Sequence, residues 1–282
     1  MSTLFDFSDY GALLALVSHS LIAGALLGLV GGLIGFFVMA RDLPFAVHGI
    51  SELSFAGAAA ALLIGADVVT GSIVGSLIAA LLVGLLGTRA RERNSVIGVL
   101  MPFGLGLGIL FLSLYPGRSA NRFGLLTGQV VSVDTPQVVT LAVVAGVVLV
   151  ALLLIWRPLL FASVDEDVAT ARGVPVRTLS LVFMVLLALT VSIAVQVVGA
   201  LLVLALLVTP AAAALRVASG PLAVSLLSMA FAVVSIVGGI LLALGAAIPI
   251  SPYVTTISFA IYLICRLIGR RGPRRADVGF RP

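Results

Sequence analysis

Long apolar runs separated by short polar segments make up most of this chain. Each run is about as long as the roughly 20 residues that a helix needs to cross a bilayer. The pattern predicts nine apolar elements, at about residues 11–40, 44–65, 68–87, 95–115, 137–156, 178–198, 199–217, 222–247 and 253–268. Pro210 lies inside the seventh element, which we therefore expect to be a bent or partial span. The pattern indicates an all-α polytopic membrane protein with eight to nine transmembrane helices.

The composition agrees with this pattern and indicates one domain. The chain has 282 residues, of which 61% are hydrophobic and 10% charged, and its mean hydropathy is +1.30. The polar segments reach only about twenty residues, which is too short for a second folded core. We therefore expect residues 1–282 to form a single transmembrane domain. The one cysteine, Cys265, excludes a disulfide within the chain.

All basic side chains in this protein are arginines. The sequence has 16 of them and no lysine. A standard nucleotide-hydrolysing P-loop needs a lysine to contact the β- and γ-phosphates. If transport by this chain is driven by ATP, a different polypeptide must therefore carry out the hydrolysis.

The arginines also predict the orientation of the chain in the membrane. With alternating connections, 14 of the 16 arginines fall on one side, and only Arg118 and Arg122 fall on the other. The positive-inside rule then places the N-terminus outside a bacterial cell membrane and the basic tail, residues 266–282, in the cytoplasm. Anionic lipid of the inner leaflet is a sufficient partner for this tail, so we expect no nucleic acid partner.

An ionisable pair lies inside the second predicted span. His48 and Glu52 are four residues apart, on one helical face, with Ser51 beside them. Such groups are costly in a bilayer and usually face a bundle interior or a watery cavity. An imidazole and a carboxylate suit a transition metal, although a polar contact between helices is an alternative. His19 and Asp67 are further candidates for a transport pathway.

Two polar segments on the predicted cytoplasmic side have features of their own. In one, acidic residues at the start and Arg-Gly at the end are typical of a short helix. This segment contains Asp165, Asp167, Arg172 and Gly173. The other closes the seventh apolar element with a proline, small residues, an arginine and a Gly-Pro break. It contains Pro210, Ala211, Ala212, Arg216, Gly220 and Pro221.

These segments resemble a known family. Asp167 to Pro175, Val197 to Arg216 with its Thr-Pro-Ala-Ala-Ala-Ala stretch, Asn94 to Leu114, and the Phe-Gly-Leu-Leu-Thr-Gly-Gln segment at 123–129 are similar to the permease subunit of zinc/manganese-type ABC importers. The resemblance extends over nearly the whole chain. It implies a fold similar to that of cobalamin-type importer permeases.

The resemblance also implies partners and a cargo. These are a second permease copy, a cytoplasmic ABC ATPase dimer, and an external or periplasmic metal-binding protein. The cargo would be zinc or manganese, with iron as a further candidate, and no cofactor would be permanently bound. In the family, the segment after the Pro-Ala-Ala run docks on the ATPase, which corresponds here to residues 211–222. The segment from Asp165 to Gly173 would be a second cytoplasmic contact.

One departure from the family pattern concerns the candidate metal site. Members typically show Asp-Ala-Leu-Ser-His in the second span, whereas this chain has His48-Gly-Ile-Ser51-Glu52. The order of imidazole and carboxylate is exchanged, but the kinds of ligand are retained. We therefore assign His48 and Glu52 as the metal residues and leave the identity of the metal open. Asn94 also stands where many members carry an acidic residue.

The leading hypothesis is a divalent-metal importer permease without catalytic residues. An iron-siderophore or cobalamin-type permease shares the expected fold and is one alternative. A secondary carrier that uses Glu52 and His48 for proton coupling is another. An intramembrane metalloprotease is disfavoured, because the chain has no His-Glu-x-x-His motif and its two histidines are 29 positions apart.

Overall fold

The computed structural model describes residues 17–86, 90–117, 135–200, 202–244 and 250–269, which form helices joined by short connections. The helices are α2 (Ser18–Ala40), α3 (Pro44–Ile64), α4 (Val68–Leu86), α5 (Ala90–Leu114), α7 (Thr135–Val164), α8 (Glu166–Ala171), α9 (Val176–Val198), α10 (Val203–Val217), α11 (Pro221–Leu244) and α12 (Ile250–Gly269). Within this part of the chain, eight helices are long and apolar enough to cross a membrane, whereas α10 has 15 residues. The all-α polytopic fold is thereby confirmed, and the seventh predicted element is a partial span.

Helix α7 extends well beyond its predicted boundary. It has 30 residues and continues from Trp156 through Pro158 to Val164, so the predicted end of this element at about residue 156 was wrong. A proline inside a membrane helix is tolerated where neighbouring structure satisfies the freed backbone groups. The predicted short helix that follows is present as α8, and Asp165 caps it by accepting a hydrogen bond from Val168 N–H at 2.9 Å.

Two other helix boundaries differ from the prediction. Helix α5 begins at Ala90 and runs through Pro102 without a break. Helix α12 begins at Ile250, so Pro252 lies in its first turn instead of in a connecting turn. The two differences have separate causes. Polar residues extend α5 beyond its apolar span, and a proline in the first turn of α12 loses no intrahelical hydrogen bond. The amphipathic piece at 123–128 lies outside the described residues.

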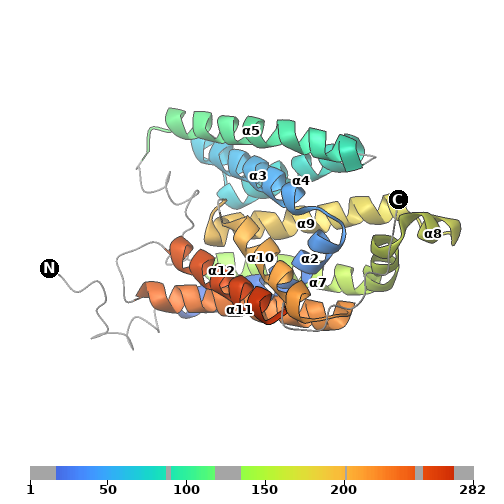
Figure 1. The fold of residues 1–282 in the computed structure, drawn as a ribbon. Helices are drawn as coiled ribbons and strands as arrows, with labels where there is room; N and C mark the ends of the chain where they lie inside the picture. Colours follow the sequence, from blue (N-terminus) through green and yellow to red (C-terminus); the bar gives the residue numbers. More distant parts are fainter. Residues whose placement is uncertain (1–16, 87–89, 118–134, 201, 245–249, 270–282) are drawn as a thin grey trace.

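The helices form two groups that lie side by side (Figure 1). Helices α3, α4 and α5 contact one another in the first group. In the second group, α2 packs on α11 and α10 packs on α12. Contacts between α4 and α9 join the two groups. Helix α3 therefore lies between α5 and the second group and contacts both α9 and α10.

Glycines allow the closest helix contacts. A Cβ atom added at Gly57 of α3 would lie 2.2 Å from the Gly71 carbonyl oxygen of α4. A Cβ atom added at Gly32 of α2 would lie 2.5 Å from the Met229 Cα atom of α11. Such close backbone approach increases van der Waals contact, which is the main source of helix association in a bilayer.

Three buried serines fix helix α3 relative to its neighbours. The hydroxyls of Ser54 in α3 and Ser72 in α4 lie 2.7 Å apart, and the Ser72 hydroxyl donates to the Ser192 carbonyl of α9 at 3.2 Å. All three side chains are fully buried. Hydrogen bonds of this kind hold the face of α3 that carries the ionisable pair at a defined rotation.

Candidate functional site

Helix α3 has a defined beginning and end. Pro44 occupies its first turn, where a missing N–H removes no intrahelical hydrogen bond. Gly65 ends it in the left-handed conformation with φ 71°, and Ala66 N–H donates to the Ala61 carbonyl at 2.8 Å. The ionisable pair therefore lies in the half of α3 nearer its N-terminal end, on the arginine-rich side of the helix bundle.

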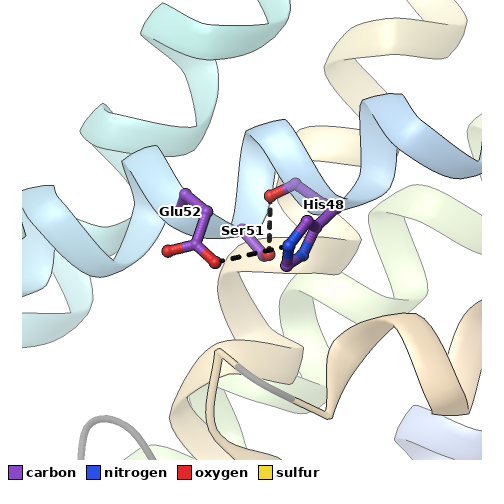
Figure 2. Close-up of polar contacts among 3 residues, drawn as sticks. All are labelled: His48, Ser51 and Glu52. Carbon is purple, nitrogen blue, oxygen red and sulfur yellow. Dashed lines mark hydrogen bonds and ion pairs between the residues drawn. The ribbon is translucent and has the colours of Figure 1, made fainter. Parts of the chain in front are cut away.

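The structure brings His48, Ser51 and Glu52 together on one side of α3 (Figure 2). His48 Nε2 lies 3.7 Å from Glu52 Oε1. The Ser51 hydroxyl donates to the His48 carbonyl oxygen at 2.8 Å, so its proton is already used within the helix. The predicted juxtaposition of imidazole and carboxylate is present, and Ser51 acts on the backbone beside it.

The pair is largely buried and incompletely satisfied. The Glu52 side chain is 4% exposed and the His48 side chain 31% exposed. His48 Nδ1 and Glu52 Oε2 are buried, and no described residue forms a hydrogen bond with either atom. Buried polar atoms are nearly always paired, and an unpaired one is unfavourable. Glu52 is therefore turned into the protein interior and His48 is partly exposed, and each carries one buried polar atom that lacks a partner among the described residues.

A single chain supplies few further ligands. No group of three or more His, Cys, Asp or Glu side chains that could hold a metal occurs in the described ranges. The arrangement can offer an ion one imidazole and one carboxylate. A closed structural site normally needs four protein ligands, so this one would be an open site.

The other two pathway candidates lie apart from this pair. His19, near the start of α2, is exposed, and its Nε2 lies 3.5 Å from the Thr135 hydroxyl at the start of α7. Asp67 precedes α4, and its Oδ2 accepts hydrogen bonds from Thr70 N–H at 2.8 Å and from the Thr70 hydroxyl at 2.6 Å. These hydrogen bonds lower the pKa of Asp67 and make it a helix cap.

A cavity of about 580 Å³ lies between α3, α4 and α5. Its walls are mainly apolar and include Leu53, Ile64 and Phe103, while Asp67 and Thr70 lie at its edge. Neither His48 nor Glu52 is among its lining residues. The wall offers a single carboxylate, that of Asp67, and lies apart from the imidazole–carboxylate pair, so this cavity is not the candidate metal site.

The segment predicted to dock on an ATPase is only partly accessible. Its first residues belong to the last turns of α10, where Pro210 and Ala211 are buried within this chain and Ala212 is half-buried. Arg216, Gly220 and Pro221 are exposed. Any contact with a partner in this conformation is therefore restricted to about 215–222. The small residues before it pack within the chain.

The end of α12 supports the exposed part of that segment. A Cβ atom added at Gly269 would lie 2.3 Å from the Arg216 carbonyl oxygen, which shows how closely the two helix ends approach. The Arg216 guanidinium lies 6.0 Å from the centre of the Tyr262 ring, a cation–π distance. The second predicted cytoplasmic contact, from Asp165 to Gly173, is the short helix α8 with its exposed connection.

Comparison with known families assigns the chain. The model of the ABC 3 transport family matches residues 14–269. The protein belongs to the ABC 3 transport family. With eight membrane-length apolar helices among its described residues, this member of the family is a multi-pass protein of the bacterial plasma membrane.

This ABC 3 family member is similar in sequence to metal transport proteins and similar in fold to a solved structure. The manganese transport system membrane protein MntC of Halalkalibacterium halodurans is 31% identical over 241 residues, covering 85% of this chain and 82% of the relative. The high-affinity zinc uptake system membrane protein ZnuB of Buchnera aphidicola is 27% identical, covering 87% and 95%. A chain of PsaBC from Streptococcus pneumoniae in complex with Fab has a TM-score of 0.82 and 26% identity, covering 92% and 95%.

Sequence reasoning missed one polar cluster. Arg41, at the end of α2, donates hydrogen bonds to Ser163 of α7 and Ser180 of α9. These partners are 122 and 139 positions away along the chain. Serines in apolar helices are common, so no local signal could have indicated this contact.

Proposed function

We propose that this chain is the transmembrane permease subunit of an ATP-driven importer for a divalent transition-metal ion. The observation that carries the proposal is the pair formed by the partly exposed His48 and the buried Glu52, in which one nitrogen and one oxygen have no partner among the described residues. A cation in transit supplies the missing partner for both atoms. The names of the manganese and zinc relatives support the same cargo class.

Two copies of the chain would complete the pathway. Each copy contributes one imidazole and one carboxylate, so a homodimer has four ligand groups of the kinds that bind first-row metals. Two ligands from each chain, with water in the remaining positions, hold an ion tightly enough to accept it and weakly enough to release it. Zinc and manganese are the favoured ions, with iron as a further candidate. The ion is cargo, and no cofactor is permanently bound.

Partner proteins would supply the energy and the delivery. The chain contains no lysine for a standard P-loop, so a separate ABC ATPase dimer performs the hydrolysis and this subunit is not an enzyme. The exposed residues at 215–222, and α8 with its connection, are the surfaces proposed for contact with that ATPase. A metal-binding protein on the opposite side of the membrane delivers the ion.

The experiment is reconstitution of the permease with its ATPase and its binding protein in proteoliposomes. ATP hydrolysis and metal accumulation are measured over a panel containing zinc, manganese, iron and magnesium. We expect stimulation by one or more of the transition metals and little by magnesium, because imidazole is a poor ligand for magnesium. The proposal would be contradicted if cobalamin or an iron–siderophore complex stimulated ATP hydrolysis while none of the free metal ions did.

Variants connect this activity to the site. His48→Ala and Glu52→Ala should insert into the membrane normally but lose metal accumulation, because each removes one ligand. Ser51→Ala is the matched control, because its hydroxyl bonds only to the helix backbone in the described structure. Normal accumulation in both ligand variants would show that the ion takes another route.

A further inference from the structure

A small cavity on the arginine-rich side of the bundle is lined by two arginines from different parts of the chain. Arg41 directly follows α2, and Arg93 lies near the start of α5. The cavity has a volume of about 30 Å³ and is also lined by Ser180. Two positive groups beside one cavity repel each other, and an anion bound between them would reduce this repulsion.

The partners of Arg41 hold its position without balancing its charge. Its Nη1 donates to the Ser163 hydroxyl at 3.3 Å and its Nη2 donates to the Ser180 hydroxyl. Its Cζ atom lies 5.9 Å from the centre of the Phe183 ring. Two hydroxyls and a ring are neutral. Within the described ranges, no Asp or Glu side chain lies within ion-pair distance of Arg41 or Arg93.

Arg93 has an unused donor at the same place. Its Nε atom is buried and forms no hydrogen bond with the residues that the structure describes. The pKa of Arg41 is lowered mainly by burial; Glu166 acts in the opposite direction, and Arg93 lowers the pKa further. Glu166, and Glu92, which precedes Arg93 in the chain, are exposed and do not line the cavity.

The shape of the cavity limits what can enter it. Its volume is enough for one or two oxygen atoms, since a water molecule occupies roughly 10–30 Å³ depending on the measure. Apolar side chains form the rest of its wall, including Leu43, Val83 and Met184. An oxyanion could therefore insert one edge between the arginines while the rest of its molecule stays outside.

We propose that Arg41 and Arg93 bind a phosphate-type oxyanion, presented by the headgroup of an anionic phospholipid in the inner leaflet. Guanidinium groups match phosphate geometry, and anionic lipids concentrate on the cytoplasmic side, where the arginine asymmetry places this end of the bundle. The bound phosphate holds the ends of α2 and α5 together and, through Ser163 and Ser180, the ends of α7 and α9. This inference does not depend on the metal pathway.

The experiment measures lipid and phosphate binding to the purified full-length permease. Native mass spectrometry counts phosphatidylglycerol retained after delipidation and titration, with phosphatidylcholine as the neutral comparison. A second titration uses inorganic phosphate, which distinguishes a soluble anion from a lipid headgroup. Arg93→Gln is the main variant because Arg93 is only half-buried, and Arg41→Lys tests the second arginine while keeping its charge. Arg177→Gln is the control, because Arg177 is exposed on the same side and does not line the cavity.

We expect wild type and Arg177→Gln to bind phosphatidylglycerol equally, and Arg93→Gln to lose roughly tenfold in affinity, as expected for one charge-assisted hydrogen bond. Arg41→Lys should lose binding to a smaller extent, because the single ammonium cannot bridge both oxygens. Competition by inorganic phosphate at similar affinity would support the anion site but assign it to a soluble phosphate. Unchanged binding in Arg93→Gln, or an equal loss in Arg177→Gln, would overturn the proposal. The same variants are tested for association with the ATPase. If Arg93→Gln and Arg41→Lys bind lipid normally but no longer associate with the ATPase, the proposal is overturned and the arginines are assigned to an acidic group of that partner.

Discussion

Glu52 places a carboxylate where a membrane protein would normally avoid one. Its side chain is 4% exposed, its nearest ionisable neighbour is His48 at 3.7 Å, and one of its oxygens has no hydrogen-bond partner. A buried ionisable pair of this kind adds little stability, because removal of both groups from water offsets their attraction. At the scale of single residues, the pair is therefore better explained by binding than by folding.

Glu52→Gln separates these two explanations. We expect the thermal unfolding midpoint in detergent to stay the same or rise, because a neutral amide is less costly to bury than a carboxylate. Metal accumulation in proteoliposomes should fall at least about tenfold, which corresponds to the loss of about 1.4 kcal/mol of ion binding. A lower unfolding midpoint together with normal accumulation would mean that Glu52 has a structural role instead.

For Asp67 we expect the reverse of Glu52, because its removal should affect stability more than metal accumulation. Hydrogen bonds from Thr70 lower the pKa of Asp67 below its ordinary value of 3.8. Its charged form therefore stabilises the start of α4 fully at pH values above 3.8. This contribution to stability is lost as the pH falls through the lower pKa of the folded state. Asp67→Ala should lower stability near neutral pH by about 1 kcal/mol. The difference from wild type should shrink in unfolding measurements as the pH is lowered below 3.8.

Metal accumulation completes the test of Asp67. Asp67→Asn keeps a good capping side chain and removes the charge. Near-normal accumulation is expected if Asp67 is mainly a cap. A strong loss in this variant with unchanged stability would return Asp67 to the ion pathway.

At the scale of helices, the position of α3 depends on small residues and buried hydroxyls. Gly57 lets α3 approach the backbone of α4, and Ser54 connects it to Ser72. Neither contact involves the ionisable pair, yet both determine which face of α3 turns toward the interior. Changes in this interface should therefore affect transport without removing any ligand.

Gly57→Ala tests this dependence. The new methyl group would lie 2.2 Å from the Gly71 carbonyl, so the helices must separate, and overpacking of this kind destabilises by about 1–3 kcal/mol. The thermal unfolding midpoint and metal accumulation should both fall. Gly106→Ala in α5 is the control, because nothing lies within 4 Å of its added Cβ atom, and it should be neutral or slightly stabilising.

At the scale of the whole molecule, the chain has a membrane domain and ionisable groups but lacks the lysine of a standard P-loop. In the described part of the chain, eight helices are long and apolar enough to cross the membrane, most arginines are predicted to lie on one side, and lysine is absent from the sequence. The ABC 3 family match covers residues 14–269, which includes all the described spans. These properties favour a subunit that moves only when a partner drives it.

A proton gradient provides the test at this scale. Proteoliposomes containing the permease without its ATPase should show no metal accumulation when a pH gradient alone is imposed. Addition of the ATPase, the binding protein and ATP should restore it. Accumulation driven by the pH gradient alone would favour the proton-coupled carrier over the importer.

Some parts of the fold and site could be predicted from local pattern, and others could not. The apolar runs located the spans, and Asp165 with Arg172 and Gly173 located the short helix α8. The end of α7 was missed because Pro158 is a poor stop signal inside a long membrane helix. The cap formed by Asp67 depends on the rotamer of Thr70, which the sequence pattern leaves open.

By itself, the sequence determined the class of the protein and the pairing of His48 with Glu52 on one face of a helix, and the arginines predict its orientation in the membrane. These depend on hydropathy, charge counts and helical spacing, which act over a few residues. The tertiary structure alone decided that this face is buried, that Pro210 and Ala211 pack inside the chain, and that Arg41 meets Arg93 at one cavity. Burial and charge clustering depend on which distant helices pack together, and that is a property of the folded bundle.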